Sequence, residues 1–252
     1  MVEFFLWYGF ITFLGLVSFP ITYKLLPFLN DKGYSISRIV GLLIWSYLFW
    51  LFTSFGVLSN DVNGALIALL MFISLSWVCL RQVGWFEIKR WMKKQIKIIV
   101  VIELLFLLSF GFWTLLRSIN PEIQGTEKPM EMAFINSISR SPTFPPNDPW
   151  LSGYAISYYY FGYIMIALLG YITGTVPAIS YNLAISAWFA LTALGCYGVV
   201  LNLLKTWQGY LHPHSRKNQE NPFVYSSLLG PVYVLIISNL EGFLEMLHAK
   251  GL

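Results

Sequence analysis

The sequence predicts an all-α, polytopic bundle of transmembrane helices, and three observations support this: its composition, its long apolar segments and the placement of its charges. Apolar residues make up 57% of the 252-residue chain and charged residues only 11%, whereas about a quarter of the residues of a soluble domain are charged. The mean hydropathy of +0.64 agrees with this. We therefore expect a multi-pass protein with a single transmembrane domain over residues 1–252.

Six segments are predicted spans because each approaches the roughly 20 apolar residues that cross a bilayer. They are residues 4–26, 39–58, 62–80, 98–116, 156–172 and 183–204. A seventh segment, 224–237, is shorter and contains Gly230 and Pro231, so we expect a broken, tilted or incomplete span and six to seven spans in all. The first segment lacks the basic flank and short apolar core of a signal peptide, so we expect it to remain as a helix.

Residues 81–97 predict an amphipathic helix that lies in the membrane interface. The apolar positions are Trp85, Ile88, Trp91 and Met92, and the basic ones are Arg81, Lys89, Arg90, Lys93, Lys94 and Lys97. Because positive charge favours the cytoplasmic side, we place this helix there and the polar loop 118–155 outside. The net charge of +4 therefore indicates contact with anionic membrane lipids and not with nucleic acid.

The loop 205–222 conflicts with this topology. It carries Lys205, Arg216 and Lys217 and would lie outside if the segments 156–172 and 183–204 both cross the membrane. Two explanations stay open at this point. Either the positive charge is tolerated outside, or the tyrosine-rich segment 156–172 does not make a simple crossing.

The external loop should begin with a short surface helix and continue as extended chain. Pro129 suits a first helical turn, and residues 130–139 place apolar side chains on one face. Four prolines between residues 142 and 149 then block a helix, and we expect a turn at Ser152 and Gly153. The next residues, Tyr158, Tyr159 and Tyr160, fit an interfacial aromatic belt, although adjacent helical positions point in different directions, so one or two should face the bundle.

Three motifs in this loop resemble a known family. The segments GTEKPMEMAF (125–134), FPPNDPWLSG (144–153) and SYYYFGY (157–163) look like the signature of the "YYY" family, a domain of unknown function in bacterial and archaeal membrane proteins. Residues 19–50 resemble its opening segment. The resemblance implies a multi-pass protein of the prokaryotic plasma membrane. Where the family usually has aspartate, this chain has Glu131, which is longer by one methylene group.

That family is in turn similar, more distantly, to the GT-C glycosyltransferases, which use sugars linked to polyprenyl phosphate. This similarity implies that Glu127 and Glu131 act as the catalytic base or as ligands of Mg²⁺ or Mn²⁺, with Asp148 as a further metal ligand. It implies that Lys128 and Arg140 bind phosphate. The implied contacts to sugar or acceptor are Trp150, Tyr158, Tyr159 and Tyr160. Members of the family are usually longer, which implies either an N-terminal portion or a shortened relative, and it leaves open that a further chain completes the bundle.

A second function class explains the same residues without catalysis: a membrane scaffold or assembly subunit whose polar loop binds a partner protein or lipid. In this interpretation Glu127 and Glu131 favour the positive end of a short helix, and Lys128 and Arg140 contact lipid headgroups. The two classes differ in geometry. Carboxylates that converge on a cavity indicate an enzyme, and carboxylates scattered over an exposed loop indicate a scaffold.

The remaining polar residues have simpler expected roles. We expect Glu103, inside the fourth span, to reach toward the interface beside Lys97, although an ionisable residue at that depth is by default a functional candidate. Asp61 should form a turn, and the pair Gly170 and Gly174 should allow close helix packing. The last group is expected to be linker or solvated surface: His212, His214, Glu241, Glu245 and His248.

Overall fold

The computed structural model describes residues 1–211 and 223–251, and this part of the chain folds as helices joined by loops. The first five are α1 (Val2–Leu25), α2 (Ser37–Ser54), α3 (Val62–Val83), α4 (Trp85–Lys94) and α5 (Ile96–Ile119). The next three are α6 (Lys128–Arg140), α7 (Phe161–Thr173) and α8 (Pro177–Leu211). The C-terminal elements are α9 (Phe223–Ser226), α10 (Leu229–Leu235), the 3-10 turn Ile237–Asn239 and α11 (Leu240–Ala249).

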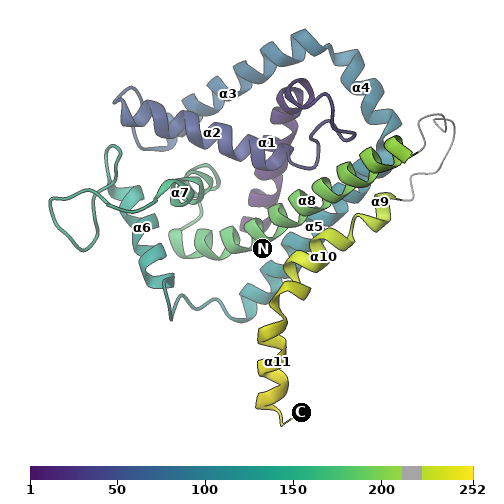
Figure 1. Cartoon of the computed structure of the whole chain (residues 1–252). Helices are drawn as coiled ribbons and strands as arrows, with labels where there is room; N and C mark the ends of the chain where they lie inside the picture. The colour runs from purple at the N-terminus through teal and green to yellow at the C-terminus, as the bar shows by residue number, and fades with distance from the viewer. Residues whose placement is uncertain (212–222, 252) are drawn as a thin grey trace.

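The long helices make a bundle with two distinct ends. Helices α5, α8 and α10 run beside one another, while α1, α2 and α3 form the other part of the bundle, and α11 projects away from it (Figure 1). We call the end that carries the loop 118–160 the loop end, and the end that carries α4 and the turn 26–36 the basic end. A core of apolar side chains joins the helices between these ends.

Five helices of the described chain are long and apolar enough to cross a membrane, namely α1, α2, α3, α5 and α8. The C-terminal pair Phe223–Leu235 and Leu240–Ala249, bent by 59°, makes a sixth if it counts as one span. The polytopic helical bundle is therefore confirmed, and so is a break in the last apolar segment. The described chain thus has five or six candidate spans where six to seven were predicted, because the segment 156–172 contains only a short helix, Phe161–Thr173.

Helix α7 is the element that differs from its prediction. It has 13 residues, or about 20 Å at 1.5 Å per residue, which is too short for a hydrocarbon core of about 30 Å. Before its start, the Tyr160 hydroxyl accepts a hydrogen bond from Trp50 Nε1 (3.2 Å). After its end, Thr175 Oγ1 accepts one from Trp7 Nε1 (3.1 Å). Because Trp50 and Trp7 belong to the loop ends of α2 and α1, both ends of α7 lie at the loop end and the helix does not cross.

This placement removes the charge conflict. Helix α8 begins at the loop end, where Asn182 contacts Arg117, and reaches the basic end, where the Asn202 amide donates to Asp31 Oδ1 (2.9 Å). The last turns of α8, including Lys205, therefore lie at the same end as α4, as the positive-inside rule favours. Of the charged residues of the loop 205–222, Lys205 lies within the described chain, and Arg216 and Lys217 lie outside it.

The two glycines that we expected to allow helix packing have different roles. A Cβ on Gly170 would lie 3.0 Å from Ser180 Oγ, so this position does permit close approach of α7 and α8. Gly174 instead ends α7 in the left-handed conformation, with φ of +67°, which glycine adopts without steric cost. The packing role expected for Gly174 was therefore wrong.

The basic end is covered by α4, the amphipathic helix expected within residues 81–97. Ile88 and Trp91 are buried, and the Trp91 ring packs near Phe19, with 5.2 Å between ring centroids. Gly84, with φ of +91°, separates α4 from α3, so Arg81 belongs to the preceding span and the interfacial helix is shorter than expected.

At the loop end, α6 forms where predicted and has Pro129 in its first turn. The chain after it folds back on itself: Asp148 N donates to Tyr154 O (2.8 Å) and Ile156 N donates to Pro146 O (2.8 Å). Gly153, with φ of +85°, lies in the turn that these two hydrogen bonds close. We call this proline-rich, non-helical segment between α6 and α7, residues 141–160, the strap. It lies over the end of the bundle.

Candidate functional site

Glu131 is the centre of a polar cluster at the loop end. Its side chain is partly buried. The Tyr181 hydroxyl donates to Glu131 Oε2 (2.6 Å), and the Tyr163 hydroxyl donates to Glu131 Oε1 (3.5 Å). The three residues come from α6, α8 and α7, so the carboxylate is fixed where three helices meet.

Local helix geometry explains how these side chains converge. Residues four apart lie on one face of a helix, and Glu131 precedes buried Ile135 on the inner face of α6. Tyr163 lies in the first turn of α7, and Tyr181 lies in the second turn of α8. The apolar faces that pack the three helices therefore also bring their polar first turns together.

The tyrosine run surrounds one side of this cluster. The Tyr158 hydroxyl donates to the Tyr159 hydroxyl (2.6 Å). This hydrogen bond, followed by desolvation and the negative charges of Tyr159, Glu127 and Glu131, raises the pKa of Tyr158 to about 12. Tyr158 therefore lies within electrostatic reach of both predicted catalytic carboxylates. Tyr160 points to Trp50 instead, so one of the three tyrosines faces the bundle as expected. The helical reason given for it was wrong, because the run precedes α7, and Tyr158 and Tyr159 lie together.

The other predicted residues of α6 lie around Glu131 or away from it. Glu127 is exposed at the start of the helix and makes no capping hydrogen bond with its side chain. Lys128 is partly buried next to it. Arg140 is exposed at the far end of α6, about 14 Å along the helix axis from Glu131, where it lines a separate hollow of about 440 Å³.

Asp148 has a structural partner that the sequence interpretation did not assign. Its Oδ1 accepts the backbone N–H groups of Trp150 (2.8 Å) and Leu151 (2.9 Å), which closes the turn of the strap. Trp150 is 62% exposed and packs edge-on against Phe134. Within residues 1–211 and 223–251 no group of three or more His, Cys, Asp or Glu is placed to hold a metal ion. The trio that includes Asp148 does not gather, and the metal role of Glu127 and Glu131 stays a prediction.

Arg117 is a functional candidate that the sequence analysis missed. Its Nε and Nη2 atoms donate to Asn182 Oδ1 at 2.8 and 2.6 Å, and Nη2 also donates to Glu122 O at 3.2 Å. Its charge also acts on the Tyr181 phenol. A signal was present, because Arg117 ends a predicted span directly before the polar loop, yet spacing alone does not show that α8 returns beside it.

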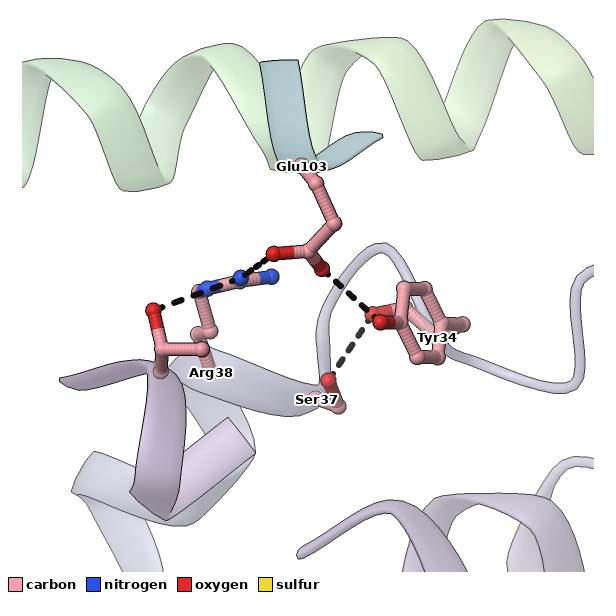
Figure 2. Close-up of polar contacts among 5 residues, drawn as sticks. Tyr34, Ser37, Arg38 and Glu103 are labelled. Atoms are coloured by element: carbon pink, nitrogen blue, oxygen red, sulfur yellow. Dashed lines mark hydrogen bonds and ion pairs between the residues drawn. The ribbon is translucent and has the colours of Figure 1, made fainter. Parts of the chain in front are cut away.

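A second polar centre lies deep in the bundle near the basic end (Figure 2). Arg38, at the start of α2, forms an ion pair with Glu103 of α5, and their side chains are 2% and 30% exposed. The Tyr34 hydroxyl donates to Glu103 Oε1 (2.8 Å). Burial, followed by the negative charge of Glu103, raises the pKa of Tyr34. The expected orientation of Glu103 toward Lys97 was wrong, since the carboxylate turns inward to Arg38 and Tyr34.

The minor expectations have separate outcomes. Asp61 does form a turn: it caps α3 by accepting the Gly64 N–H (2.8 Å). Glu241 and Glu245 lie on exposed α11 as expected. Cys79 is buried and Cys196 is partly buried, in agreement with packing as small apolar residues. The pair His212 and His214 lies outside the described residues.

The fold and this site define a class: a multi-pass helical membrane protein with a carboxylate and tyrosine cluster at one end of its bundle. Within that class the chain belongs to the family described as "Uncharacterized membrane protein (DUF2298)", whose sequence model matches residues 44–252. The match confirms the expected membership in a membrane family defined by a domain of unknown function. Comparisons with curated proteins and with solved structures gave no match.

Proposed function

We propose that this protein transfers a sugar from polyprenyl phosphate at the loop end of the bundle, the side predicted to be external. The observation that carries the proposal is the position of Glu131, a partly buried carboxylate held by tyrosines from two other helices. Carboxylates that act as bases are typically held in such partly enclosed polar sites. The distant resemblance to the GT-C enzymes supports the choice of reaction.

Glu131 would act as the general base. In an inverting transfer, a carboxylate takes the proton of the acceptor hydroxyl while the acceptor oxygen bonds to the anomeric carbon of the sugar. The bond from that carbon to the lipid phosphate breaks, and the phosphate leaves with the electron pair. Tyr181 and Tyr163 position the carboxylate, and Tyr158 and Tyr159 offer rings against which a sugar stacks.

The leaving phosphate needs positive charge. Arg117 and Lys128 are the cations that the described structure places at this end of α5 and α6. Mg²⁺ commonly binds to one or two carboxylates together with substrate phosphate oxygens, so Glu127 would hold a divalent cation that offsets the phosphate charge, while Glu131 stays free to take the acceptor proton. Arg140 and Asp148 are not required in this proposal, because the first lines a separate hollow and the second closes its own turn.

A scaffold is the second candidate, and the surface of the strap favours it. Trp150 and Tyr159 are 62% and 76% exposed, and exposed aromatic residues are common at the centres of protein interfaces. Glu127 and Arg140 are also exposed on α6. In this case the loop end binds a partner protein, and Glu131 stabilises the junction of α6, α7 and α8.

The test is transfer by the purified chain in liposomes that contain radiolabelled polyprenyl-phosphate hexoses and Mg²⁺ or Mn²⁺. We expect turnover, and we expect Glu131→Gln to reduce it by about 100-fold or more, the usual contribution of a general base. Glu122→Gln is the matched control, since Glu122 is exposed in the same loop and its backbone carbonyl contacts Arg117. Absence of turnover favours the scaffold, and full activity of Glu131→Gln removes Glu131 as the base.

A further inference from the structure

A small cavity lies between the same three helices, and its lining starts one helical turn beyond Glu131, which does not line it. It measures about 300 Å³, at the lower end of the size range of ligand pockets. On α6 its wall begins at Ile135, one helical turn after Glu131, and on α7 it begins at Ala167, one turn after Tyr163. Since these pairs share helix faces, the cavity continues the Glu131 cluster.

The polar groups of this cavity are hydroxyls. They belong to Ser139, Tyr171, Thr175 and Ser180. The residues that line it, all within the described chain, include no charged side chain. An anion such as phosphate would therefore find no opposite charge within it, and a cation would find no carboxylate.

The hydrogen bonds of these hydroxyls show what the cavity offers a ligand. Ser139 Oγ donates to Ile135 O (3.0 Å), Tyr171 Oη donates to Asn60 Oδ1 (3.4 Å), and Ser180 Oγ donates to Thr175 O (3.3 Å). Each proton is thus directed to a protein oxygen, while a hydroxyl oxygen retains acceptor capacity. The cavity consequently presents acceptors and favours a neutral ligand that is rich in donors.

Thr175 fixes one wall of the cavity and has little remaining capacity. Its Oγ1 accepts from Trp7 Nε1 (3.1 Å) and also bonds to Thr173 Oγ1 (3.0 Å) and Ser180 Oγ (2.8 Å). We assign it a positioning role. The apolar part of the wall comes from Ile135, Ala167 and Pro177, which suit the C–H face of a ring.

From this geometry we propose that the cavity binds a single sugar ring, the hexose of the substrate whose reacting carbon faces Glu131. The proposal rests on the proposed transferase function for the identity of the substrate. The volume of the cavity fits one ring, its acceptors match sugar hydroxyls, and it continues the cluster around Glu131, the proposed base. Gly170 is required at this site because a Cβ there would lie 3.0 Å from Ser180 Oγ and 3.3 Å from Thr175 O.

The experiment measures saturation-transfer NMR from the full chain in nanodiscs to three probes: the methyl glycosides of glucose, mannose and galactose. We expect a signal for at least one probe. Ser139→Val should weaken its binding by about fivefold or more, the effect of one net hydrogen bond. Gly170→Ala, on a different helix, should also weaken it, because the added Cβ crowds the cavity. Gly162→Ala is the matched control, because it lies on α7 with no atom within 4 Å of the added Cβ.

The outcomes separate this inference from the proposed function. No signal for any probe, or equal signals from all variants, overturns the inference. Binding that Gly170→Ala and Ser139→Val weaken, without any hexose transfer in liposomes, keeps the sugar site and rejects the transferase. Transfer that persists unchanged in both variants keeps the transferase and rejects this cavity as its sugar site. Ser139 is exposed, so the Ser139→Val result stands even if Gly170→Ala fails to fold.

Discussion

Arg38 is a fully charged side chain at a site where only 2% of it is exposed. Its ion pair with Glu103 and its stacking over the Phe106 ring, 4.6 Å from the guanidinium carbon to the ring centroid, offset part of the desolvation cost. Arg38 Nε has no hydrogen-bond partner in the described structure. Stabilisation of the buried Arg38 charge therefore depends strongly on Glu103.

We predict an asymmetric cost when one partner is removed. Glu103→Gln leaves the buried Arg38 charge unpaired and should destabilise by about 3–5 kcal/mol. Arg38→Gln leaves a carboxylate that is 30% exposed and still bonded to Tyr34, so it should cost less, about 1–3 kcal/mol. Thermal unfolding in detergent measures both values. Equal costs would contradict the predicted asymmetry, and a double variant as unstable as the sum of the single variants would show that the two side chains are not coupled.

Asp61 allows a prediction about pH. The Gly64 N–H, followed by the Ser59 hydroxyl, lowers the pKa of Asp61 below its usual value. A carboxylate whose pKa is lowered in the folded state contributes stability above its unfolded pKa of about 3.9, and this contribution is lost as the pH falls through the folded value. We expect Asp61→Ala to cost about 1 kcal/mol at pH 7, and this difference should shrink below pH 4.

The control for this prediction is Asp61→Asn, since asparagine also accepts the Gly64 N–H but does not titrate. Its stability relative to Asp61→Ala should be independent of pH in melting curves between pH 7 and pH 3. A constant difference between the wild type and Asp61→Ala over that range would contradict the assignment of Asp61 as a charged cap.

At the scale of elements, α7 determines the topology of the second half of the chain. If α7 stays at the loop end, α8 carries the chain back to the basic end, and Gly209 lies on the same side as Lys93 of α4. If α7 crossed the membrane, Gly209 would lie on the side of Ser152. The two arrangements therefore place Gly209 on opposite sides of the membrane.

We predict that a membrane-impermeant thiol reagent labels Ser152→Cys in intact cells and leaves Gly209→Cys and Lys93→Cys unlabelled until the cells are opened. All three positions are exposed. The background should have Cys79 and Cys196 replaced by alanine, which removes the native thiols. Labelling of Gly209→Cys in intact cells would mean that α7 crosses the membrane after all.

Apolar patterning predicted the long helices well because length and hydropathy are properties of the segment itself. The span prediction for residues 156–172 failed because the run is apolar, whereas the helix begins only at Phe161 and ends at Thr173. The charge of the loop 205–222 already conflicted with a full crossing, so the arrangement that the short α7 favours was one of the two alternatives left open. The site was predicted only in part: α6 gave Glu131, but Tyr163, Tyr181 and Arg117 depend on which helices meet, and spacing does not contain that information.

For the whole molecule, contacts between distant parts of the chain hold the basic end together. Asn202 of α8 accepts the backbone N–H of Asn30 (2.7 Å), and its amide donates to the carboxylate of buried Asp31 (2.9 Å). That carboxylate also accepts the Gly33 N–H (3.1 Å) and the Ser35 N–H (3.0 Å). One amide side chain thus joins the turn after α1 to the end of α8.

We predict that Asn202→Leu destabilises the protein by about 2–6 kcal/mol, because it leaves the partly buried Asn30 donor and one interaction of Asp31 unsatisfied, at about 1–3 kcal/mol each. For a chain of this size that corresponds to a fall in melting temperature of roughly 4–24 °C. Leu203→Ala is the matched control: Leu203 is the next residue of α8 and is exposed, so its truncation should shift the melting temperature by less than about 2 °C. Equal shifts for the two variants would place the stability of this end in apolar packing alone. A large shift confined to Asn202→Leu would show that a polar clamp fixes α8 against the first helices and so sets where the Glu131 cluster forms at its other end.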